Sequence, residues 1–214
     1  MGREGQPVAE LLPRPLTLDG ARTAAAGCRA CELWRVGTRT VFGEGTPPCA
    51  IMLVGEQPGD REDLEGRPFV GPAGELLDRA LGEAGLDRGT VYVTNAVKHF
   101  RWVRQGRRRL GRKPGVSHIL ACRPWLQAEV ELVRPGLIVL LGAVAARSVL
   151  DREVRVLEQR GRIHPSPLGP PAMITVHPSS VLRSPDPQSR ERSYLDLVAD
   201  LSGAARWIRP DRTP

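Results

Sequence analysis

The chain has 214 residues, a formal net charge of +7 and a sequence pI near 10.0. This length suits one α/β domain with short tails, and no apolar run approaches the length that crosses a membrane. The positive charge favours an anionic partner, and clustered arginines make nucleic acid the first candidate, although codon usage can also enrich arginine. No signal peptide is recognisable, so we expect a cytoplasmic protein.

The predicted organisation is one folded unit between two tails. Residues 1–19 contain prolines without hydrophobic periodicity, which indicates a flexible N-terminal tail. Residues 20–206 form the expected domain, and residues 207–214 form a C-terminal tail. We expect a monomer.

Short apolar runs, separated by helical patterns, predict the strands of a buried parallel sheet. These runs are residues 50–54, 91–97, 137–141 and 172–176. The segment between the last two runs is predicted to be a helix followed by a proline-rich loop, with a short strand near Arg162. The sequence therefore predicts the α/β class.

Polar residues follow three of these runs. GEQPGD contains Glu56 and Asp60, VTN ends at Asn95, and HPSS begins at His177. Because ligands of open α/β sheets bind at the carboxyl ends of strands, we expect these residues to share one cleft. Each motif could also be an ordinary turn or helix cap.

Two further segments contain candidate functional residues. Phe69 lies between glycines and prolines, where it could form a rigid platform or a hydrophobic plug that seals its own loop. The segment at residues 101–114, RWVRQGRRRLGRKP, is too charged and too interrupted by glycine for the core, so we expect a surface loop. Such a loop could bind phosphates or simply be solvated.

A Cys-x-x-Cys pair, Cys28 and Cys31, lies near the end of a helix predicted over residues 18–34. Two thiolates at this spacing can bind zinc or an iron–sulfur centre, or form a redox pair. Any further ligands of such a metal centre would have to come from distant parts of the sequence. The sequence offers Cys49, His99, His118 and Cys122.

Five segments, GEQPGD, RPFVGPAG, VTNAVKHF, ACRPWL and VHPSS, follow one another in an order that resembles the iron–sulfur uracil-DNA glycosylases. The UdgX-type branch is the most similar, and the likeness extends from about Cys28 to Leu182. The resemblance implies a three-layer α/β/α sandwich with a central four-stranded parallel sheet. It also implies release of free uracil from uracil-containing DNA, single- or double-stranded, which leaves an abasic site.

The resemblance implies roles for individual residues. The catalytic residues would be Glu56, Gln57, Asp60 and His177. The uracil site would comprise Gly55, Gln57, Phe69, Asn95 and His177. DNA would contact Arg107, Arg108, Arg109, Arg112, Lys113, Ser179 and Ser180. A 4Fe-4S cluster would be held by Cys28, Cys31, His99 and Cys122, with histidine where the wider family has cysteine.

One departure from the UdgX-type pattern changes the expected chemistry. In those proteins a loop histidine attacks C1′ of the sugar and leaves the protein covalently joined to DNA, whereas the aligned position here is Gly111. We therefore expect water to be the nucleophile and the enzyme to turn over. Two alternatives remain, a protein that traps uracil-containing DNA with little turnover, and a redox or nucleotide-binding module supported only by the Cys-x-x-Cys pair and the α/β pattern.

Overall fold

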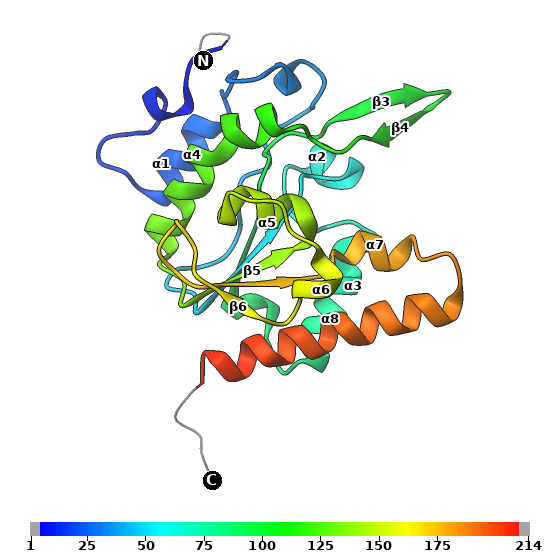
Figure 1. Ribbon diagram of the computed structural model, residues 1–214. Coiled ribbons are helices and arrows are strands. Elements are labelled where there is room, and N and C mark those ends of the chain that lie inside the picture. Colours follow the sequence, from blue (N-terminus) through cyan, green and yellow to red (C-terminus); the bar gives the residue numbers. More distant parts are fainter. Residues whose placement is uncertain (1–4, 210–214) are drawn as a thin grey trace.

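A five-stranded sheet lies at the centre of the structure, a computed structural model that describes residues 5–209 (Figure 1). In spatial order the strands are β2 (Val91–Asn95), β1 (Ile51–Gly55), β5 (Leu137–Leu141), β7 (Ala172–Thr175) and β6 (Ile163–His164). The first four are parallel to one another, so the predicted four-stranded parallel sheet is confirmed. The two-residue strand β6 pairs antiparallel with β7 and adds an edge strand to it.

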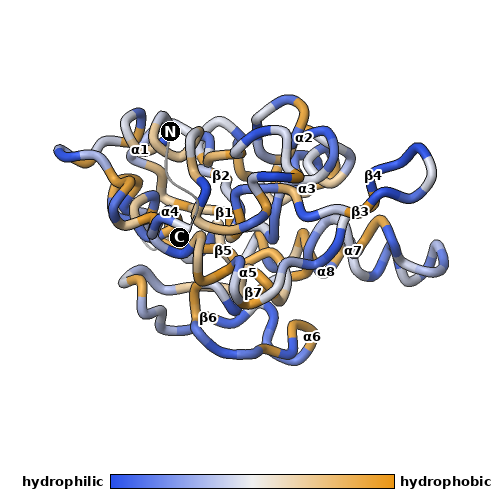
Figure 2. The backbone as a smooth tube through the Cα atoms, turned by 90° about the horizontal axis from the view of Figure 1, so that it is seen from above, coloured by the Kyte–Doolittle hydropathy of each residue, from blue (hydrophilic) through white to orange (hydrophobic). Residues whose placement is uncertain are grey.

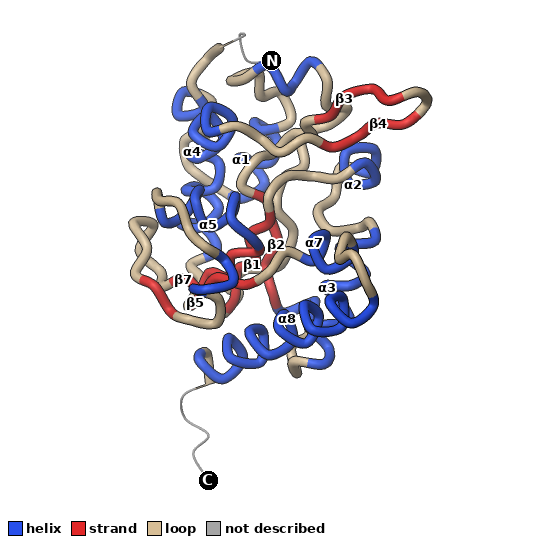
Figure 3. The backbone as a smooth tube through the Cα atoms, turned by 45° about the vertical axis from the view of Figure 1, so that its right-hand side comes forward, coloured by secondary structure: helices blue, strands red, loops and turns tan. Residues whose placement is uncertain are grey.

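Helices cover both faces of the sheet, which confirms the three-layer arrangement (Figure 3). One face packs against α4 (Val116–Val133) and α5 (Gly142–Leu150), and the other against α3 (Pro72–Glu83), α7 (Pro178–Leu182) and α8 (Pro187–Trp207). Every residue of the four parallel strands is buried, because apolar side chains point into both helical layers. None of the helices within residues 5–209 is both long and apolar enough to cross a membrane.

The basic segment is an antiparallel hairpin and not the irregular loop that we expected. Its strands β3 (Trp102–Gln105) and β4 (Arg108–Gly111) form a separate two-stranded sheet. Figure 2 shows the hairpin as a mostly hydrophilic projection from the body of the protein. Charged residues conceal the strand pattern in the sequence, since Val103 and Leu110 are its only aliphatic cross-strand pair.

The N-terminal third contains short elements that pack on α4. They are η1 (Val8–Glu10), α1 (Leu18–Ala25) and η2 (Glu32–Arg35). The helix predicted over residues 18–34 is wrong in length, because the chain turns at Gly27 and places both cysteines of the pair outside α1. The remaining short helices are α2 (Asp60–Glu65), η3 (Arg88–Thr90) and α6 (Val156–Gln159).

The predicted tails fall partly outside the described residues, since residues 1–4 and 210–214 are not covered. Within the described part of the N-terminal segment, Val8 is buried against Ala21, Ala25 and Trp125. At the other end, α8 extends to Trp207. The domain boundaries stay a prediction.

Candidate active site

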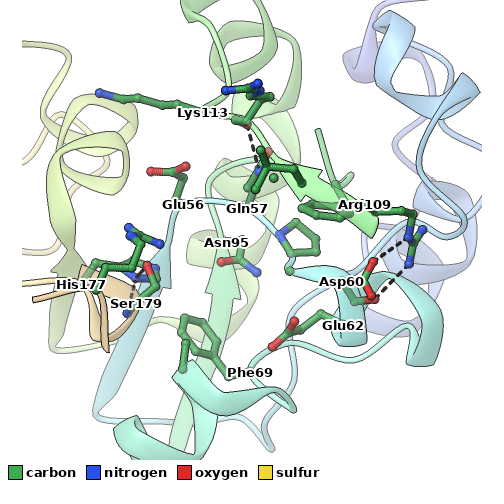
Figure 4. A pocket seen from close by; sticks show the side chains of 18 residues that line it. Glu56, Gln57, Asp60, Glu62, Phe69, Asn95, Arg109, Lys113, His177 and Ser179 are labelled. Carbon is green, nitrogen blue, oxygen red and sulfur yellow. Dashed lines mark hydrogen bonds and ion pairs between the residues drawn. The ribbon is translucent and has the colours of Figure 1, made fainter. Parts of the chain in front are cut away.

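A cavity of about 580 Å³ opens at the carboxyl ends of the parallel strands (Figure 4). This volume lies within the ordinary range of small-molecule sites, about 300–1,000 Å³. The lining side chains come from the ends of β1 and β2, the turn before α3, the start of α7 and the basic hairpin. Those named by the sequence analysis are Glu56, Gln57, Asp60, Phe69, Asn95, Arg109, Gly111, Arg112, Lys113, His177 and Ser179.

Glu56 follows the last residue of β1, and its carboxylate points into the cavity (Figure 4). Its own carbonyl oxygen accepts a hydrogen bond from the Val97 backbone N–H at 3.1 Å, which fixes the backbone beside the end of β2. Burial raises the pKa of the Glu56 carboxyl, and the positive charges of Lys113 and Arg183 partly oppose this effect. A carboxylate with a raised pKa is a stronger base towards a nearby water.

Asn95 and Phe69 lie together against the backbone of Gly55. A Cβ atom at Gly55 would come within 2.6 Å of the Phe69 ring and would also collide with the Asn95 side-chain oxygen, so only glycine allows this packing. Phe69 has a φ of 56°, and the residue is 7% exposed. Within the described residues the Asn95 amide has no hydrogen-bond partner, which leaves its donor and acceptor available to a ligand.

His177 lies across the cavity from Asn95, directly before α7 (Figure 4). Its Nδ1 accepts the Ser179 backbone N–H at 3.0 Å and lies 2.8 Å from the Ser179 hydroxyl oxygen. Since Nδ1 is an acceptor, the proton of the neutral ring lies on Nε2. Burial lowers the pKa of His177 to about 4, and the positive charge of Arg183 acts in the same direction. The ring is therefore a neutral donor at physiological pH.

The Phe69 and His177 rings are nearly parallel, with an interplanar angle of 29° and centroids 6.3 Å apart. Glu56, Phe69, Asn95 and His177 thus surround one space. Glu56, Asn95 and His177 were expected to share a cleft because they follow strands, and they lie together. Phe69 reaches the same space from the turn before α3 and not from a strand end.

Gln57 and Asp60 also line the cavity, but other residues engage their side chains. The Gln57 amide accepts from the Arg101 backbone N–H at 3.2 Å and donates to the Arg112 carbonyl at 3.1 Å, which joins the two ends of the hairpin to β1. Asp60 forms an ion pair with Arg109 at 2.5 Å. Figure 4 shows Asp60 turned towards Arg109, whereas Glu56 is directed into the open space.

The expected DNA-binding residues separate into three groups. Arg112 and Lys113 line the cavity, while Arg107 and Arg108 are exposed near the hairpin turn, outside its lining. Arg109 also lines the cavity but is held by acidic partners: besides its ion pair with Asp60, its Nη1 bonds to the buried Asp63 at 2.6 Å.

The two serines after His177 also differ in position. Ser179 lines the cavity, whereas Ser180 is exposed and donates its hydroxyl to the His177 carbonyl at 2.6 Å. Ser180 therefore also stabilises the first turn of α7.

The expected cluster ligands come together in part. A hydrogen bond with Cys122 lowers the pKa of the Cys31 thiol to about 7, and the same contact with burial raises the pKa of Cys122. Cys28 lies close enough to Cys122 to affect it electrostatically, and Cys28 shares a cavity of about 160 Å³ with His99. Burial lowers the pKa of His99 to about 4, and its Nε2 lies 2.9 Å from the Thr40 hydroxyl.

These side chains do not enclose a single ion, since residues 5–209 contain no group of three ligands arranged to hold one. A 4Fe-4S cluster needs a wider arrangement, because each ligand binds a different iron. One observation fits such a group: the buried indole N–H of Trp34, which lines the same small cavity as Cys28 and His99, has no partner among the described residues. Cluster sulfurs accept hydrogen bonds of this kind.

The other candidate ligands have structural partners. His118 Nδ1 accepts the Gly115 backbone N–H at 2.9 Å, and its Nε2 lies 2.6 Å from the Glu32 carboxylate. The Cys49 thiol is buried at the start of β1 and donates to the Thr46 carbonyl. Both side chains are therefore engaged by residues outside the expected set of cluster ligands.

Several lining residues were missed by the sequence analysis. They are Pro58, Gly59, Glu62, Ala73, Phe100, Leu110 and Arg183. Glu62 is 7% exposed and accepts the Gly71 backbone N–H at 2.9 Å, so it holds the turn that carries Phe69. Its position two residues after GEQPGD was the available signal. Arg183 follows HPSS by three residues and could have been included with that motif.

Comparison with known proteins gives a consistent result. Residues 42–202 match the family described as the uracil DNA glycosylase superfamily. The chain is 38% identical to a type-4 uracil-DNA glycosylase of Thermotoga maritima over 86% of this chain and 91% of the relative. It is 34% identical to a type-4 uracil-DNA glycosylase of Pyrobaculum aerophilum over 86% of this chain and 94% of the relative.

A third relative, a type-4 uracil-DNA glycosylase of Sulfurisphaera tokodaii, is 39% identical over 64% of this chain. That match spans 59% of the relative's length. The superfamily expected from the five sequence motifs is thus confirmed, while the UdgX-type branch stays a prediction. The chain therefore belongs to the uracil-DNA glycosylase superfamily, as the match over residues 42–202 shows and as the parallel sheet with its cavity supports.

Proposed function

We propose that this protein is a DNA-repair glycosylase that removes uracil from DNA by hydrolysis and turns over. Uracil rotates out of the DNA stack into the cavity, at a cost of a few kcal/mol. Its products are free uracil and an abasic site. The single observation that carries the proposal is the convergence of Glu56, Phe69, Asn95 and His177 on one cavity.

Recognition follows from the two residues packed on Gly55. Phe69 offers a fixed ring on which the base stacks, worth about 1–3 kcal/mol. The unpartnered Asn95 amide donates to O4 of uracil and accepts from N3–H, whereas the amino group of cytosine would face the amide donor. Because both base and amide are removed from water, a mismatched base leaves buried polar groups unpaired.

Cleavage of the glycosidic bond depends on two other residues of the cavity, His177 and Glu56. Loss of the base places negative charge on uracil O2 and positive charge on the sugar. The neutral His177 donates its Nε2–H to O2 and stabilises the leaving anion in the manner of an oxyanion hole. Glu56 orients the attacking water and stabilises the positively charged sugar. Asp60 has a structural role instead, because its ion pair with Arg109 holds the β3–β4 hairpin against the cavity.

Water is the nucleophile because the hairpin presents no imidazole to the cavity. Gly111 lies in the lining. It is the residue that the sequence resemblance aligns with the histidine of UdgX-type proteins. Its neighbours Leu110 and Arg112 lack a nucleophilic nitrogen or oxygen. DNA phosphates are bound by Arg112 and Lys113 at the cavity and by Arg107 and Arg108 beyond it.

A 4Fe-4S cluster held by Cys28, Cys31, His99 and Cys122 is part of the proposal. It is supported by the neighbouring free thiols and the orphaned Trp34 N–H. Such a group would supply structural crosslinks here. These would fix the segment after β2, because the Lys98 backbone N–H also bonds to Cys122. Iron and acid-labile sulfide in the purified protein would support this assignment, and zinc alone would contradict it.

Incubation with a uracil-containing oligonucleotide tests turnover. We expect free uracil in molar excess over enzyme, strands that break in alkali, and no protein–DNA band that resists denaturation. Gly111→Ala is the matched control, because it adds a methyl group near the Phe100 ring without a nucleophile. Gly111→His introduces an imidazole at the cavity and should produce some resistant band. A resistant band with the unaltered protein would contradict hydrolysis and favour the trapping alternative.

A further inference from the structure

A buried charged network lies behind the end of β2, on the opposite side of the strand from the cavity. Lys98 and Glu129 form an ion pair at 2.5 Å, and their side chains are 1% and 0% exposed. Glu129 reaches the strand from α4, and Lys98 folds back from the segment that follows β2. Neither residue lines the cavity or contacts the proposed substrate.

Every polar group of this network is satisfied. The Lys98 ammonium donates to the Thr94 hydroxyl at 2.6 Å, the Asn95 carbonyl at 2.9 Å and Glu129. The Glu129 carboxylate also accepts from the Thr94 hydroxyl at 2.9 Å, the Tyr92 hydroxyl at 3.1 Å and the Gly43 backbone N–H at 2.8 Å. The three donors of the ammonium are therefore used completely, one of them by the backbone of Asn95.

Stability alone does not account for such a network. Removing two charges from water is costly, and apolar residues of similar volume often stabilise a buried position at least as well. The network instead fixes the position of the backbone at the end of β2. The Lys98 ammonium binds both Thr94 and Asn95. The next two backbone N–H groups, of Ala96 and Val97, donate to carbonyls at the end of β1.

Asn95 needs such support more than its neighbours do. Its side-chain amide has no hydrogen-bond partner among the described residues, so only packing and the backbone decide where it points. A displacement of about 1 Å in an active site can reduce the rate by about 10²-fold.

We propose that Lys98, Glu129 and Thr94 are positioning residues that hold the Asn95 amide in the geometry that recognises the base. The proposal rests on the proposed uracil excision. The network acts on catalysis only through Asn95. Its removal should therefore reduce activity when Asn95 is present and have almost no further effect when Asn95 is absent.

A double-mutant cycle between Thr94→Val and Asn95→Ala tests this coupling in the full-length holoprotein. Valine keeps the shape of threonine but removes the hydroxyl that accepts a hydrogen bond from Lys98 and donates one to Glu129. We expect Thr94→Val to lower kcat for uracil excision by about 10- to 10²-fold with little change in KM. In the Asn95→Ala background the same change should alter kcat by less than about twofold, the usual limit of additivity.

Two controls separate positioning from loss of stability. Thr94→Ser keeps the hydroxyl and should restore kcat. Leu201→Ala makes a cavity in the core formed with α8, at a residue that does not line the active-site cavity, and should lower the melting temperature without reducing kcat at moderate temperature. An equal loss from Thr94→Val in both backgrounds, or no loss at all, would overturn the inference. If the unaltered protein released no uracil, the proposed function itself would fail.

Discussion

The ends of β2 and β7 contain similar buried polar networks that differ in their exposure and in what they support. Each strand end has a threonine whose hydroxyl donates to a carboxylate from a covering helix, at 2.9 Å for Thr94 and Glu129 and at 2.6 Å for Thr175 and Asp200. Each carboxylate also pairs with a cation. Lys98 is 1% exposed, whereas Arg160, the partner of Asp200, is 21% exposed.

The two ends differ in how the functional side chain beyond them is held. His177 is oriented locally, because the backbone N–H and hydroxyl of Ser179 both meet its Nδ1. Asn95 has no such partner, and its backbone is bound by Lys98. A side chain with its own hydrogen bonds tolerates small strand movements, whereas one that is free to pair with a ligand depends on the strand beneath it.

Removal of the imidazole at the end of β7 should have the largest effect. His177→Ala deletes the donor to uracil O2, and we expect kcat to fall by about 10²–10³-fold, the usual loss for such a donor. Single-turnover excision under saturating enzyme measures this step. His177→Gln, which can still donate an N–H, should lose less. A loss in kcat below about tenfold for His177→Ala would contradict the proposed role of the imidazole as a donor to uracil O2.

Removal of the amide at the end of β2 should have a smaller effect and change selectivity. Asn95→Ala should reduce kcat/KM for uracil by about 10- to 100-fold, which corresponds to about 1–3 kcal/mol for an unpaired polar group. The measurement compares matched oligonucleotides with uracil or cytosine at one site. The melting temperature should not change, since the amide has no partner within the described residues. A drop in stability without lost selectivity would assign Asn95 a structural role.

The sequence predicted the central sheet well because its strands are buried on both faces. Continuous apolar runs such as residues 137–141 have no solvent-facing positions, and the polar residues associated with the ends of three of the four runs mark the rim of the sheet. This rule placed Glu56, Asn95 and His177 at one edge of the sheet, and the resemblance of the motifs to a known family favoured a shared site over ordinary turns. Phe69 joins them through a turn whose backbone has a positive φ, for which the flanking glycines and prolines were the signal.

Partners that are distant along the chain could not be predicted from the sequence. Arg109 reads as one more exposed arginine, yet it bonds to Asp60 and Asp63, which belong to another element. His118 was one candidate metal ligand in the sequence, but the structure places Glu32 and the Gly115 N–H beside its ring. In each case the role depends on which residue fills the neighbouring space, and spacing along the chain does not contain this information.

The smallest effect on activity is expected from the network behind β7. Thr175→Val removes the hydroxyl that donates to Asp200, whose pKa is raised by burial although Thr175 and Arg160 oppose this. We expect a loss of about 1–2 kcal/mol in the free energy of unfolding, measured with denaturant. The value of kcat/KM should stay within about twofold, because Ser179 orients His177 independently of the strand. An activity loss as large as that of Thr94→Val would show that both strand ends depend on their buried carboxylates, and the contrast between them would disappear.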